Sequence, residues 1–335
     1  MVETSLYTNE DLKEMQQWSL ERKIQVTTTR LIEWYKHYNG KCYVSFSGGK
    51  DSTVLADVSA KICKLLGYKL VLWFSDTGLE FPELKQHTKD YVVWLKNKYN
   101  IEVELVVDFP KDRKGKRITF KDVLFKYGYP LISKNQAQYI NEYKHSKSDK
   151  LKDLRWNGSE QHGYFKISEC YKYLVEAPFE ITHKCCYVMK KNPAHLFNKE
   201  RGLVPIIGTM AMESMQRRNT WLQNGCNAFN TSNPSSQPIS FWTDQDVLKY
   251  IKEFNIPYAS VYGDIIEEDG KYKTTGYSRT GCVFCGFGCQ AECEPNRFQR
   301  LKKTHPKLWE YCMKPISEGG LGMKEILEYI NVKIE

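Results

Sequence analysis

The chain has 335 residues, 49 basic against 40 acidic residues for a formal net charge of +9, and 11 cysteines. A hydrophobic content of 41% and a charged content of 27% are typical of a globular protein and exclude intrinsic disorder. The start of the chain shows neither a basic leader nor an apolar stretch, and no apolar run approaches the ~18 residues of a membrane span. We therefore expect a cytoplasmic protein without a membrane partner, whose cysteines serve metal binding or thiol chemistry rather than disulfides.

The first third of the chain alternates between strand and helix patterns. Residues 10–36 have the apolar spacing of a long helix, and 42–46 predicts a strand that breaks into a glycine turn. A helix is predicted over 53–66, followed by strands at 69–74 and 101–107 with a second helix between them. This alternation predicts an α/β fold with a doubly wound, mostly parallel sheet flanked by helices, in which ligands bind beyond the carboxyl ends of the strands.

Residues 110–180 lose this rhythm and contain two basic stretches, 111–117 and 145–153. Each stretch is read either as solvated surface or as a rim that holds a polyanionic substrate. A strand pattern returns at 203–208, and Thr243 is expected to cap a later helix as part of a capping box.

The turn after the first strand reads Ser-Gly-Gly-Lys-Asp-Ser over residues 47–52. Between a strand and a helix, this turn places backbone N–H groups, a lysine and hydroxyls at a helix N-terminus, which is how phosphate is held. It lacks the Walker A spacing, and two consecutive glycines before Lys-Asp-Ser disfavour an ordinary turn. Asp51, together with Asp76 after the next strand, is suited to a Mg²⁺ ion that screens phosphates; the alternative role of Asp51 is a helix cap.

Residues 45–52 resemble the pyrophosphate loop (PP-loop) of the adenine nucleotide α-hydrolase-like fold, which includes N-type ATP pyrophosphatases and sulfonucleotide reductases. Residues 74–83 are similar to the Asp-Thr-Gly-x-x-Phe-Pro-Glu segment of phosphoadenosine phosphosulfate (PAPS) reductases, and further similarity follows in the same order at 208–217, 238–247 and 256–258. The resemblance implies ATP or a related adenine nucleotide, with the base near Ser45 and Phe46. The nucleotide-binding residues that it implies are Ser45, Phe46, Ser47, Gly48, Gly49, Lys50, Asp51, Ser52, Asp76 and Thr77.

These patterns divide the chain into three parts. We expect an N-terminal helical segment at 1–37, a PP-loop nucleotide-binding α/β domain at 38–260 with a basic insertion at about 110–180, and a cysteine-rich helical region at 261–335.

Four cysteines lie within twelve residues of the C-terminal region, at Cys282, Cys285, Cys289 and Cys293. A Cys-x-x-Cys turn lets two sulfurs reach one metal, and the glycines around it free backbone N–H groups to point at sulfur. Upstream lies the adjacent pair Cys185-Cys186, and Cys-Cys followed by Cys-x-x-Cys resembles the iron–sulfur motif of adenylyl-sulfate (APS) reductases. That resemblance implies a 4Fe-4S cluster on four ligands: Cys185, Cys186, Cys282 and Cys285.

Three other interpretations of the cysteines stay open. The same four thiolates suit a structural zinc, or a cluster is held locally by residues 282, 285, 289 and 293. In the third interpretation, Cys289 or Cys293 carries reactive sulfur outside the cluster. Three cysteines on apolar segments are predicted core residues: Cys42, Cys63 and Cys170.

Two reaction classes share such a nucleotide pocket. Sulfonucleotide reductases use a cysteine in a C-terminal Glu-Cys-Gly-Leu-His motif, which this chain lacks; its last cysteine is Cys312. The family's Gly-x-Arg before Glu-Ser is also replaced by Gly-Thr-Met at 208–210, which removes an anion-binding arginine. We therefore favour ATP-dependent adenylation of an acceptor, with pyrophosphate release and then sulfur transfer, as in PAPS reductase-like proteins that modify DNA or tRNA.

The predicted catalytic residues are Lys50 for the leaving pyrophosphate, Asp51 with Mg²⁺, and Arg217, or its neighbour Arg218, for charge at the reacting phosphate. The alternatives are an APS or PAPS reductase that releases sulfite and a non-catalytic regulator that senses nucleotide or redox state. The partners considered are an adenine nucleotide, a nucleic-acid acceptor, a protein that donates sulfur and a second copy of the chain.

Overall fold

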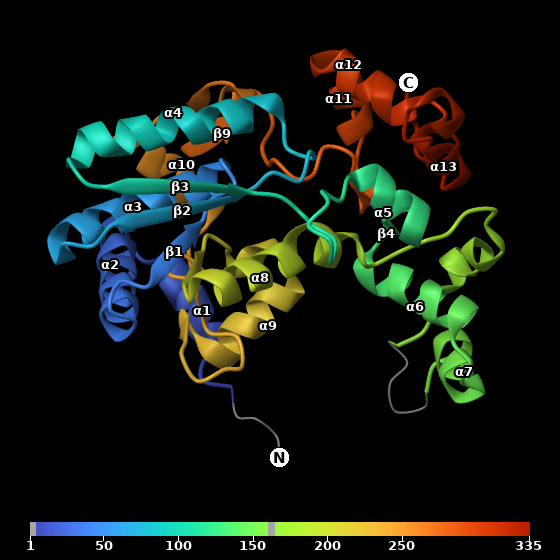
Figure 1. Ribbon diagram of the computed structural model, residues 1–335, viewed down its shortest axis with the longest axis horizontal. Helices are drawn as coiled ribbons and strands as arrows, with labels where there is room; N and C mark the ends of the chain where they lie inside the picture. Colours follow the sequence, from blue (N-terminus) through green and yellow to red (C-terminus); the bar gives the residue numbers. More distant parts are fainter. Residues whose placement is uncertain (1–4, 160–164) are drawn as a thin grey trace. The chain divides into compact units, whose positions relative to one another are not determined.

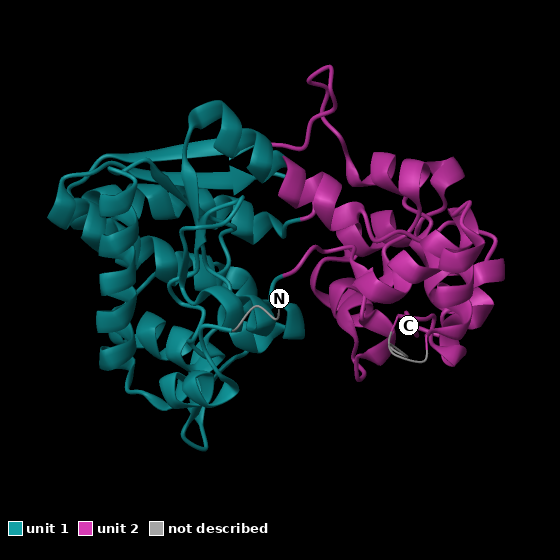
Figure 2. Cartoon of the chain, turned by 90° about the horizontal axis from the view of Figure 1, so that it is seen from below, with its two compact units in different colours: residues 1–76, 80–108, 193–280 teal, residues 77–79, 109–192, 281–335 magenta. Residues whose placement is uncertain are grey.

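The computed structural model describes residues 5–159 and 165–335, which form two compact units (Figure 2). Unit 1 consists of Met1–Asp76, Glu80–Asp108 and Pro193–Thr280, and unit 2 of Thr77–Leu79, Phe109–Asn192 and Gly281–Glu335. The division differs from the three consecutive parts expected from the sequence, because the chain passes between the units several times. The insertion thereby joins the cysteine-rich region in unit 2, and residues 261–280 belong to unit 1.

Unit 1 contains a six-stranded sheet in the order β3-β2-β1-β5-β7-β6. Neighbouring strands run parallel from β3 to β7, and only β6 is antiparallel to its neighbour. The strands are β1 (Cys42–Ser45), β2 (Leu70–Ser75), β3 (Val103–Asp108), β5 (Val204–Ile207), β6 (Asn227–Ala228) and β7 (Ser235–Ser236). The predicted doubly wound, mostly parallel α/β fold is confirmed. Strand β1 lies inside the sheet, and its carboxyl end leads into residues 47–52, which we call the phosphate loop.

Side chains of β2 alternate between two apolar layers. Leu70 and Leu72 belong to the large core, which also contains Tyr91 of α4 (Pro82–Tyr99), whereas Trp73 packs with Phe197 of α8 (Asn192–Arg201). Figure 1 shows these two helices on opposite sides of the sheet. A strand buried on both faces explains the continuous apolar run that the sequence shows here.

The remaining helices of unit 1 are α1 (Asn9–Gln17), α2 (Leu20–His37), α3 (Lys50–Leu66), α9 (Met215–Asn224) and α10 (Asp244–Glu253). The single helix expected over 10–36 is two helices, because the backbone leaves the helical conformation at Trp18 and the Ser19 side chain accepts a hydrogen bond from Arg22 N as a new N-cap. Thr243 caps α10 in the capping box that the sequence predicts. A hairpin of β8 (Ile265–Glu268) and β9 (Lys271–Thr274) follows α10.

A buried carboxylate joins three helices of unit 1. Asp57 of α3 has no exposed surface, and its oxygens accept hydrogen bonds from the hydroxyls of Tyr99 (2.6 Å) and Tyr250 (2.7 Å). The ammonium groups of Lys61 (3.0 Å) and Lys98 (3.4 Å) complete its surroundings. Two cations and two hydroxyls compensate the free-energy cost of removing this carboxylate from water. These contacts hold α4 and α10 against α3.

Unit 2 is mainly helical, so the insertion that lacks the sheet rhythm is not a loop. Its helices are α5 (Phe120–Tyr127), α6 (Lys134–His145), α7 (Asp149–Asn157), α11 (Arg297–Thr304), α12 (Pro306–Met313) and α13 (Met323–Tyr329). Strand β4 (Leu131–Ile132) of the insertion pairs in parallel with β10 (Gly286–Phe287) of the cysteine-rich region. This short sheet holds the two segments together.

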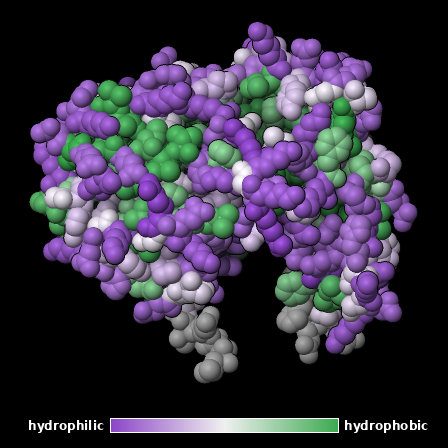
Figure 3. All heavy atoms as spheres, viewed as in Figure 1, coloured by the Kyte–Doolittle hydropathy of each residue, from purple (hydrophilic) through white to green (hydrophobic). Residues whose placement is uncertain are grey.

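Hydrophilic side chains predominate on the face drawn in Figure 3. Among the helices of residues 5–159 and 165–335, none combines the length and apolar character that crossing a membrane requires.

Candidate functional site

The phosphate loop connects β1 to α3, and its shape depends on Gly48. This residue has a φ of 74°, and a Cβ there would lie 2.7 Å from the carbonyl oxygen of Leu84. A side chain at this position is therefore excluded by both strain and collision. Ser47 and Ser52 face each other with 3.1 Å between their Oγ atoms, and Gly49 N donates to Ser47 Oγ. The backbone and two hydroxyls thus surround the N-terminus of α3.

Lys50 begins α3 and is 4% exposed. Its Nζ lies 2.9 Å from Oδ1 of Asp51 and 2.9 Å from Oδ1 of Asp244, the first residue of α10. Burial alone would lower the pKa of Lys50, but the two carboxylates raise it above its usual value. The lysine is therefore held as an ammonium ion at the loop.

Asp51 lies in the first turn of α3, where its charge is stabilised by the helix dipole, and Gly49 rather than Asp51 is the N-cap. Burial raises the pKa of Asp51, Lys50 partly offsets this rise, and Glu213 raises the pKa further. A carboxylate in these surroundings gains from a bound cation, which is the role that Mg²⁺ would fill.

Glu213 connects the loop to two arginines. Gly208 after β5 lies beside the loop, since a Cβ on it would be 3.3 Å from Cα of Ser52. Beyond it, Glu213 forms ion pairs with Arg217 and, at 2.5 Å, with Arg279. Arg218 instead donates to Oδ1 of Asn9 at 2.9 Å. Of the two arginines that the sequence offers, Arg217 is therefore the one connected to the loop.

Tyr262 supports the loop from a later segment of unit 1. Its hydroxyl accepts a hydrogen bond from Lys50 N (3.1 Å) and lies 2.6 Å from Oγ1 of Thr280. Burial raises the pKa of the Tyr262 hydroxyl. The tyrosine therefore stays neutral and holds a backbone N–H of the first turn in place.

Four further residues were expected to contact the nucleotide. The side chain of Phe46 is buried in the core against Tyr91, so its backbone is the part left for a ligand, whereas Ser45 is partly exposed at the end of β1. Asp76 pairs with Lys85 at 2.5 Å and would have to exchange this ammonium to bind Mg²⁺. Thr77 is buried, and its Oγ1 accepts a hydrogen bond from Leu79 N.

The four cysteines of the predicted cluster line one narrow cavity of about 20 Å³ in unit 2. Apolar side chains form most of its other walls, and Lys190 is its cationic member. Burial raises the pKa of the Cys185 thiol, and the neighbouring thiols of Cys282 and Cys186 raise it further. A metal centre would reverse this effect, because a coordinated thiol is deprotonated.

The backbone around these cysteines is unusual at three points. Cys185 and Cys186 lead directly into a π-helical turn at Tyr187–Lys191, a feature frequent at functional sites. Gly286, next to Cys285, packs so closely that a Cβ would lie 2.7 Å from Pro130 O. Ile132, which pairs with Phe287, has a φ of 61°, which is strained for a β-branched residue. The surrounding contacts hold this geometry in place.

The other cysteines divide by burial. Cys42 and Cys63 are buried as predicted, but Cys170 is exposed, because its short 3₁₀ segment lies on the surface of the helical insertion. Cys289 is buried with Sγ 3.0 Å from Gly286 O, and Cys293 is exposed. Neither Cys289 nor Cys293 is among the residues that line the cavity.

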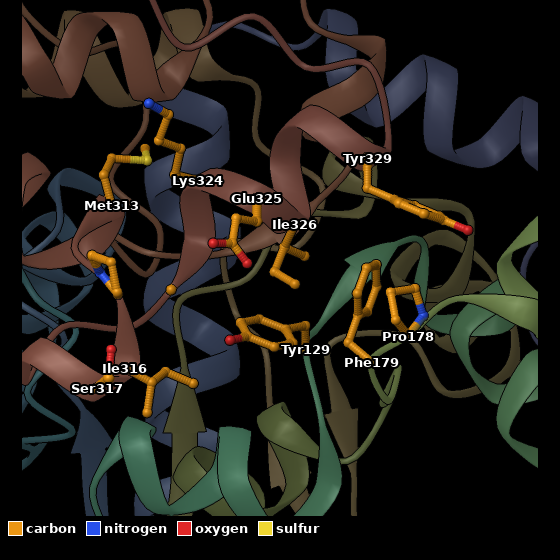
Figure 4. A pocket seen from close by; sticks show the side chains of 12 residues that line it. Tyr129, Pro178, Phe179, Met313, Ile316, Ser317, Lys324, Glu325, Ile326 and Tyr329 are labelled. Atoms are coloured by element: carbon orange, nitrogen blue, oxygen red, sulfur yellow. The ribbon is translucent and has the colours of Figure 1, made fainter.

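A larger cavity of about 580 Å³ lies elsewhere in unit 2 (Figure 4). Phe179 and Tyr329 meet edge to face in its wall, with ring centroids 5.2 Å apart, and Lys324 and Glu325 are its charged residues. It contains none of the residues that the sequence singles out.

The sequence matches the phosphoadenosine phosphosulfate reductase domain over residues 41–159 and 134–286, two overlapping stretches that cover most of the chain. The chain belongs to this family. The phosphate loop, the Glu213–Arg217 pair and all four predicted cluster cysteines lie within the matched residues.

Two curated proteins of Methanocaldococcus jannaschii are relatives of this family member. Uncharacterized protein MJ0973 is 25% identical over 327 residues, which cover 97% of this chain and 59% of that protein. Uncharacterized protein MJ0066 is 23% identical over 286 residues, covering 82% of this chain and 41% of that protein. The chain therefore spans about half the length of these relatives.

Two solved structures are distantly similar. NMN synthetase from Francisella tularensis has 14% identity and a TM-score of 0.35, with 72% of each chain covered. The U34-tRNA thiolase NcsA from Methanococcus maripaludis, solved with its 4Fe-4S cluster, has 15% identity and a TM-score of 0.37, with 94% of this chain and 83% of that chain covered. Similarity this distant supports no statement about the reaction.

The four cysteines supply the ligand type and number that an iron–sulfur cluster requires, since their thiols line one mainly apolar cavity. Among the described residues, no group of three or more His, Cys, Asp or Glu side chains is arranged to hold a metal ion. The same donor set also suits zinc, so both metals stay predictions.

Two residues that contact Lys50 of the phosphate loop are not singled out by the sequence. Asp244 was interpreted only through its neighbour Thr243 as the start of a helix, although it lies within the segment 238–247 that resembles PAPS reductases. Tyr262 carries no local signal, because it is one of 22 tyrosines and its contact with Lys50 spans 212 positions.

Proposed function

We propose that the chain is an ATP-dependent adenylating enzyme that activates an acceptor for sulfur transfer. In the first step, an acceptor oxygen attacks the α-phosphorus of ATP, the bond to the β-phosphate breaks, and pyrophosphate leaves. In the second step, a sulfur nucleophile at the oxidation level of sulfide forms a carbon–sulfur bond, and AMP leaves with the oxygen. Both steps balance without an external oxidant or reductant.

The observation that carries this proposal is Lys50, a buried ammonium in the phosphate loop with one carboxylate on each side. When pyrophosphate charge develops, the ammonium can turn from Asp51 and Asp244 to the leaving group, and Asp51 is freed for a cation. Arg217 exchanges Glu213 for the reacting phosphate in the same way.

Cys185, Cys186, Cys282 and Cys285 are the residues that would hold the metal centre. Because each iron would then have one cysteine ligand, a 4Fe-4S cluster would supply a redox or structural centre, and the sulfide would come from a separate sulfur donor. The apolar residues that line the cavity would limit the access of water to the cluster.

Pyrophosphate release tests the first step. The purified protein is incubated with ATP, Mg²⁺ and total cellular RNA or DNA, and we expect release that Lys50→Ala reduces by at least about 100-fold. Lys64→Ala, an exposed lysine on the same helix, is the matched control and should keep full activity. Sulfite release from APS or PAPS without pyrophosphate would establish the reductase instead. Nucleotide binding without either product would establish the regulator.

Metal content tests the cysteine assignment. After anaerobic purification we expect about four irons and four sulfides per chain, lost in Cys185→Ser and retained in Cys170→Ser. Zinc in a colourless protein would contradict the cluster. Loss of metal in Cys293→Ser but not in Cys185→Ser would establish the local set at 282–293 instead.

A further inference from the structure

The positive charge of the chain is concentrated in unit 2. Residues 109–192 contain 18 lysines and arginines against 9 aspartates and glutamates, an excess equal to the net charge of the whole chain. Unit 1, which holds the phosphate loop, contains 23 basic against 24 acidic residues. A long polyanion is therefore attracted to unit 2, and the nucleotide site itself does not account for the basic character of the protein.

Five of the lysines and arginines of unit 2 lie in a loop at 111–117, which we call the basic hairpin. Lys111 and Arg117 form an antiparallel bridge at its base, and both cations lie 5.3 Å from the ring centroid of Phe109. At its tip, Oδ1 of Asp112 accepts hydrogen bonds from the backbone N–H groups of Lys114 (2.8 Å) and Lys116 (2.9 Å). One carboxylate thus shapes a turn whose cations, Arg113, Lys114 and Lys116, are exposed.

Exposed aromatic rings and lysines lie on two of the segments that line the cysteine cavity. Phe125 of α5 is 65% exposed and has Lys121 Nζ 5.9 Å from its ring centroid. Tyr187, which directly follows Cys186, is 54% exposed. Lys184 Nζ lies 5.5 Å from the ring centroid of Tyr127 and so connects the two segments. We call Lys121, Phe125, Lys184 and Tyr187 the cysteine rim.

The basic hairpin is followed directly in the chain by the part of the cysteine rim that lies on α5. Arg117 is three residues before Phe120, and Phe120 lines the cavity together with Cys186 and Lys190. Exposed aromatic rings on segments that also carry lysines suit a partner that offers both flat faces and negative charge, and the lysines disfavour an apolar protein surface. Bases of a single strand meet both requirements, because they stack on aromatic rings while their phosphates bind cations.

We propose that the basic hairpin and the cysteine rim bind a single-stranded stretch of nucleic acid. The hairpin cations contact phosphates, and Phe125 and Tyr187 stack on unpaired bases beside the cysteine cavity. This site rests on the proposed function in one respect, since it identifies the acceptor oxygen as a carbonyl oxygen of a base in the bound strand. A duplex is excluded because its base faces are covered by neighbouring pairs.

Binding is measured by fluorescence anisotropy with labelled RNA and DNA strands of about 20 nucleotides, alone and as duplexes. The variants Arg113→Gln, Lys114→Gln and Lys116→Gln are combined in one protein. Its matched control combines three exposed unit 1 lysines: Lys36→Gln, Lys64→Gln and Lys96→Gln. Over about 50 to 200 mM salt, we expect the hairpin variant to bind more weakly and its log–log salt slope to fall by about 2, while the control is unchanged.

Stacking is tested separately from charge. Phe125→Ala and Tyr187→Ala should each weaken single-strand binding about 5- to 100-fold without changing the salt slope, and Tyr187→Phe should bind as the parent does. A circular-dichroism melt checks that each variant is folded. The RNA and DNA arms decide which strand is preferred, and either preference supports the site.

Three results would overturn the site: equal weakening by the hairpin and control triples, a duplex bound as tightly as the single strand, or full binding by Phe125→Ala. Competition by polyglutamate equal to that by RNA would identify an acidic protein as the partner instead. Rim-dependent binding without pyrophosphate release would refute the adenylation alone. Pyrophosphate release that depends on Lys50 but not on any nucleic acid would refute only the nucleic-acid site at the basic hairpin and the cysteine rim.

Discussion

The Nζ of Lys50 lies 2.9 Å from Oδ1 of Asp244, which is 194 positions later in the chain. This contact joins the first turn of α3 to the first turn of α10, so two helix N-termini meet at the phosphate loop. A bound polyphosphate would replace Asp244 as the partner of the ammonium, and the carboxylate competes with the ligand until then.

Removing the charge of Asp244 should therefore tighten nucleotide binding. Asp244→Asn keeps the size of the side chain and an oxygen acceptor for Lys50 but removes a negative charge that repels phosphate. We expect the dissociation constant for Mg·ATP, measured by calorimetry, to fall about 2- to 10-fold. Asp269→Asn, on an exposed hairpin turn of the same unit, should leave the constant unchanged. Weaker binding by Asp244→Asn would show that the carboxylate positions Lys50 rather than competing for it.

His87 predicts an acid-sensitive stability. It is 7% exposed, lies 3.1 Å from Oγ1 of Thr53, and burial lowers its pKa to about 4. Because the unfolded histidine titrates near 6.5, the unfolded state binds the proton first as the pH falls. The stabilising contribution of the neutral ring is complete above about pH 6.5 and is lost between about pH 6.5 and 4, amounting to about 2 kcal/mol between pH 7 and pH 5.

Urea unfolding at these two pH values measures this loss. Between pH 7 and pH 5 the free energy of unfolding of the parent should fall by about 2 kcal/mol more than that of His87→Gln, because the glutamine side chain does not titrate. The same difference in both proteins would mean that His87 is protonated without cost in the folded state.

The carboxylate of Asp57 predicts a graded stability series. Asp57→Ala leaves two tyrosine hydroxyls without their acceptor and two lysines without their counter-charge, so we expect the free energy of unfolding to fall by about 3 kcal/mol. Tyr250→Phe removes one of these hydroxyls and should cost about 1 kcal/mol. Denaturant titration gives both values, and equal losses in the two variants would contradict a network centred on the carboxylate.

Gly286 predicts that metal content depends on the short sheet of unit 2. In Gly286→Ala the new Cβ would lie 2.7 Å from Pro130 O and 2.8 Å from Cδ2 of Leu131, so β10 must move away from β4 and carry Cys285 with it. Gly281→Ala, where a Cβ meets nothing within 4 Å, is the matched control. We expect metal per chain, measured after anaerobic purification, to fall in the first variant only. Normal metal content in Gly286→Ala would show that the ligands do not need this pairing.

Local features of the chain were predictable wherever the interaction partners are close in sequence. The phosphate loop at 47–52 depends on a strand, two glycines and the following helix, and Thr243 and Asp246 cap α10 from three residues apart. The cysteine set was predictable for another reason. Its two pairs, at 185–186 and 282–285, form a residue pattern that resembles a known motif. In the structure both pairs line one cavity, next to the strands β4 and β10 that pair in parallel.

Long-range packing decided what the sequence alone left open. Arg217 and Arg218 are equivalent as neighbours in the chain, and only the position of Glu213 distinguishes them. Cys170 lies in an apolar stretch but is exposed, since a short 3₁₀ segment cannot bury every side chain.

By itself, the sequence determined the α/β class, the phosphate loop and the cysteine pairs, because these rest on periodicity and on neighbours a few residues apart. Only the tertiary structure decided that Asp244 and Tyr262 complete the lysine's surroundings and that the positive charge belongs to the unit that holds the cysteines. The physical reason is the same in both cases. A contact across about 200 positions lowers the conformational entropy of the chain, and this loss is offset by the packing of many side chains across the whole unit. No short stretch of residues therefore encodes such a contact.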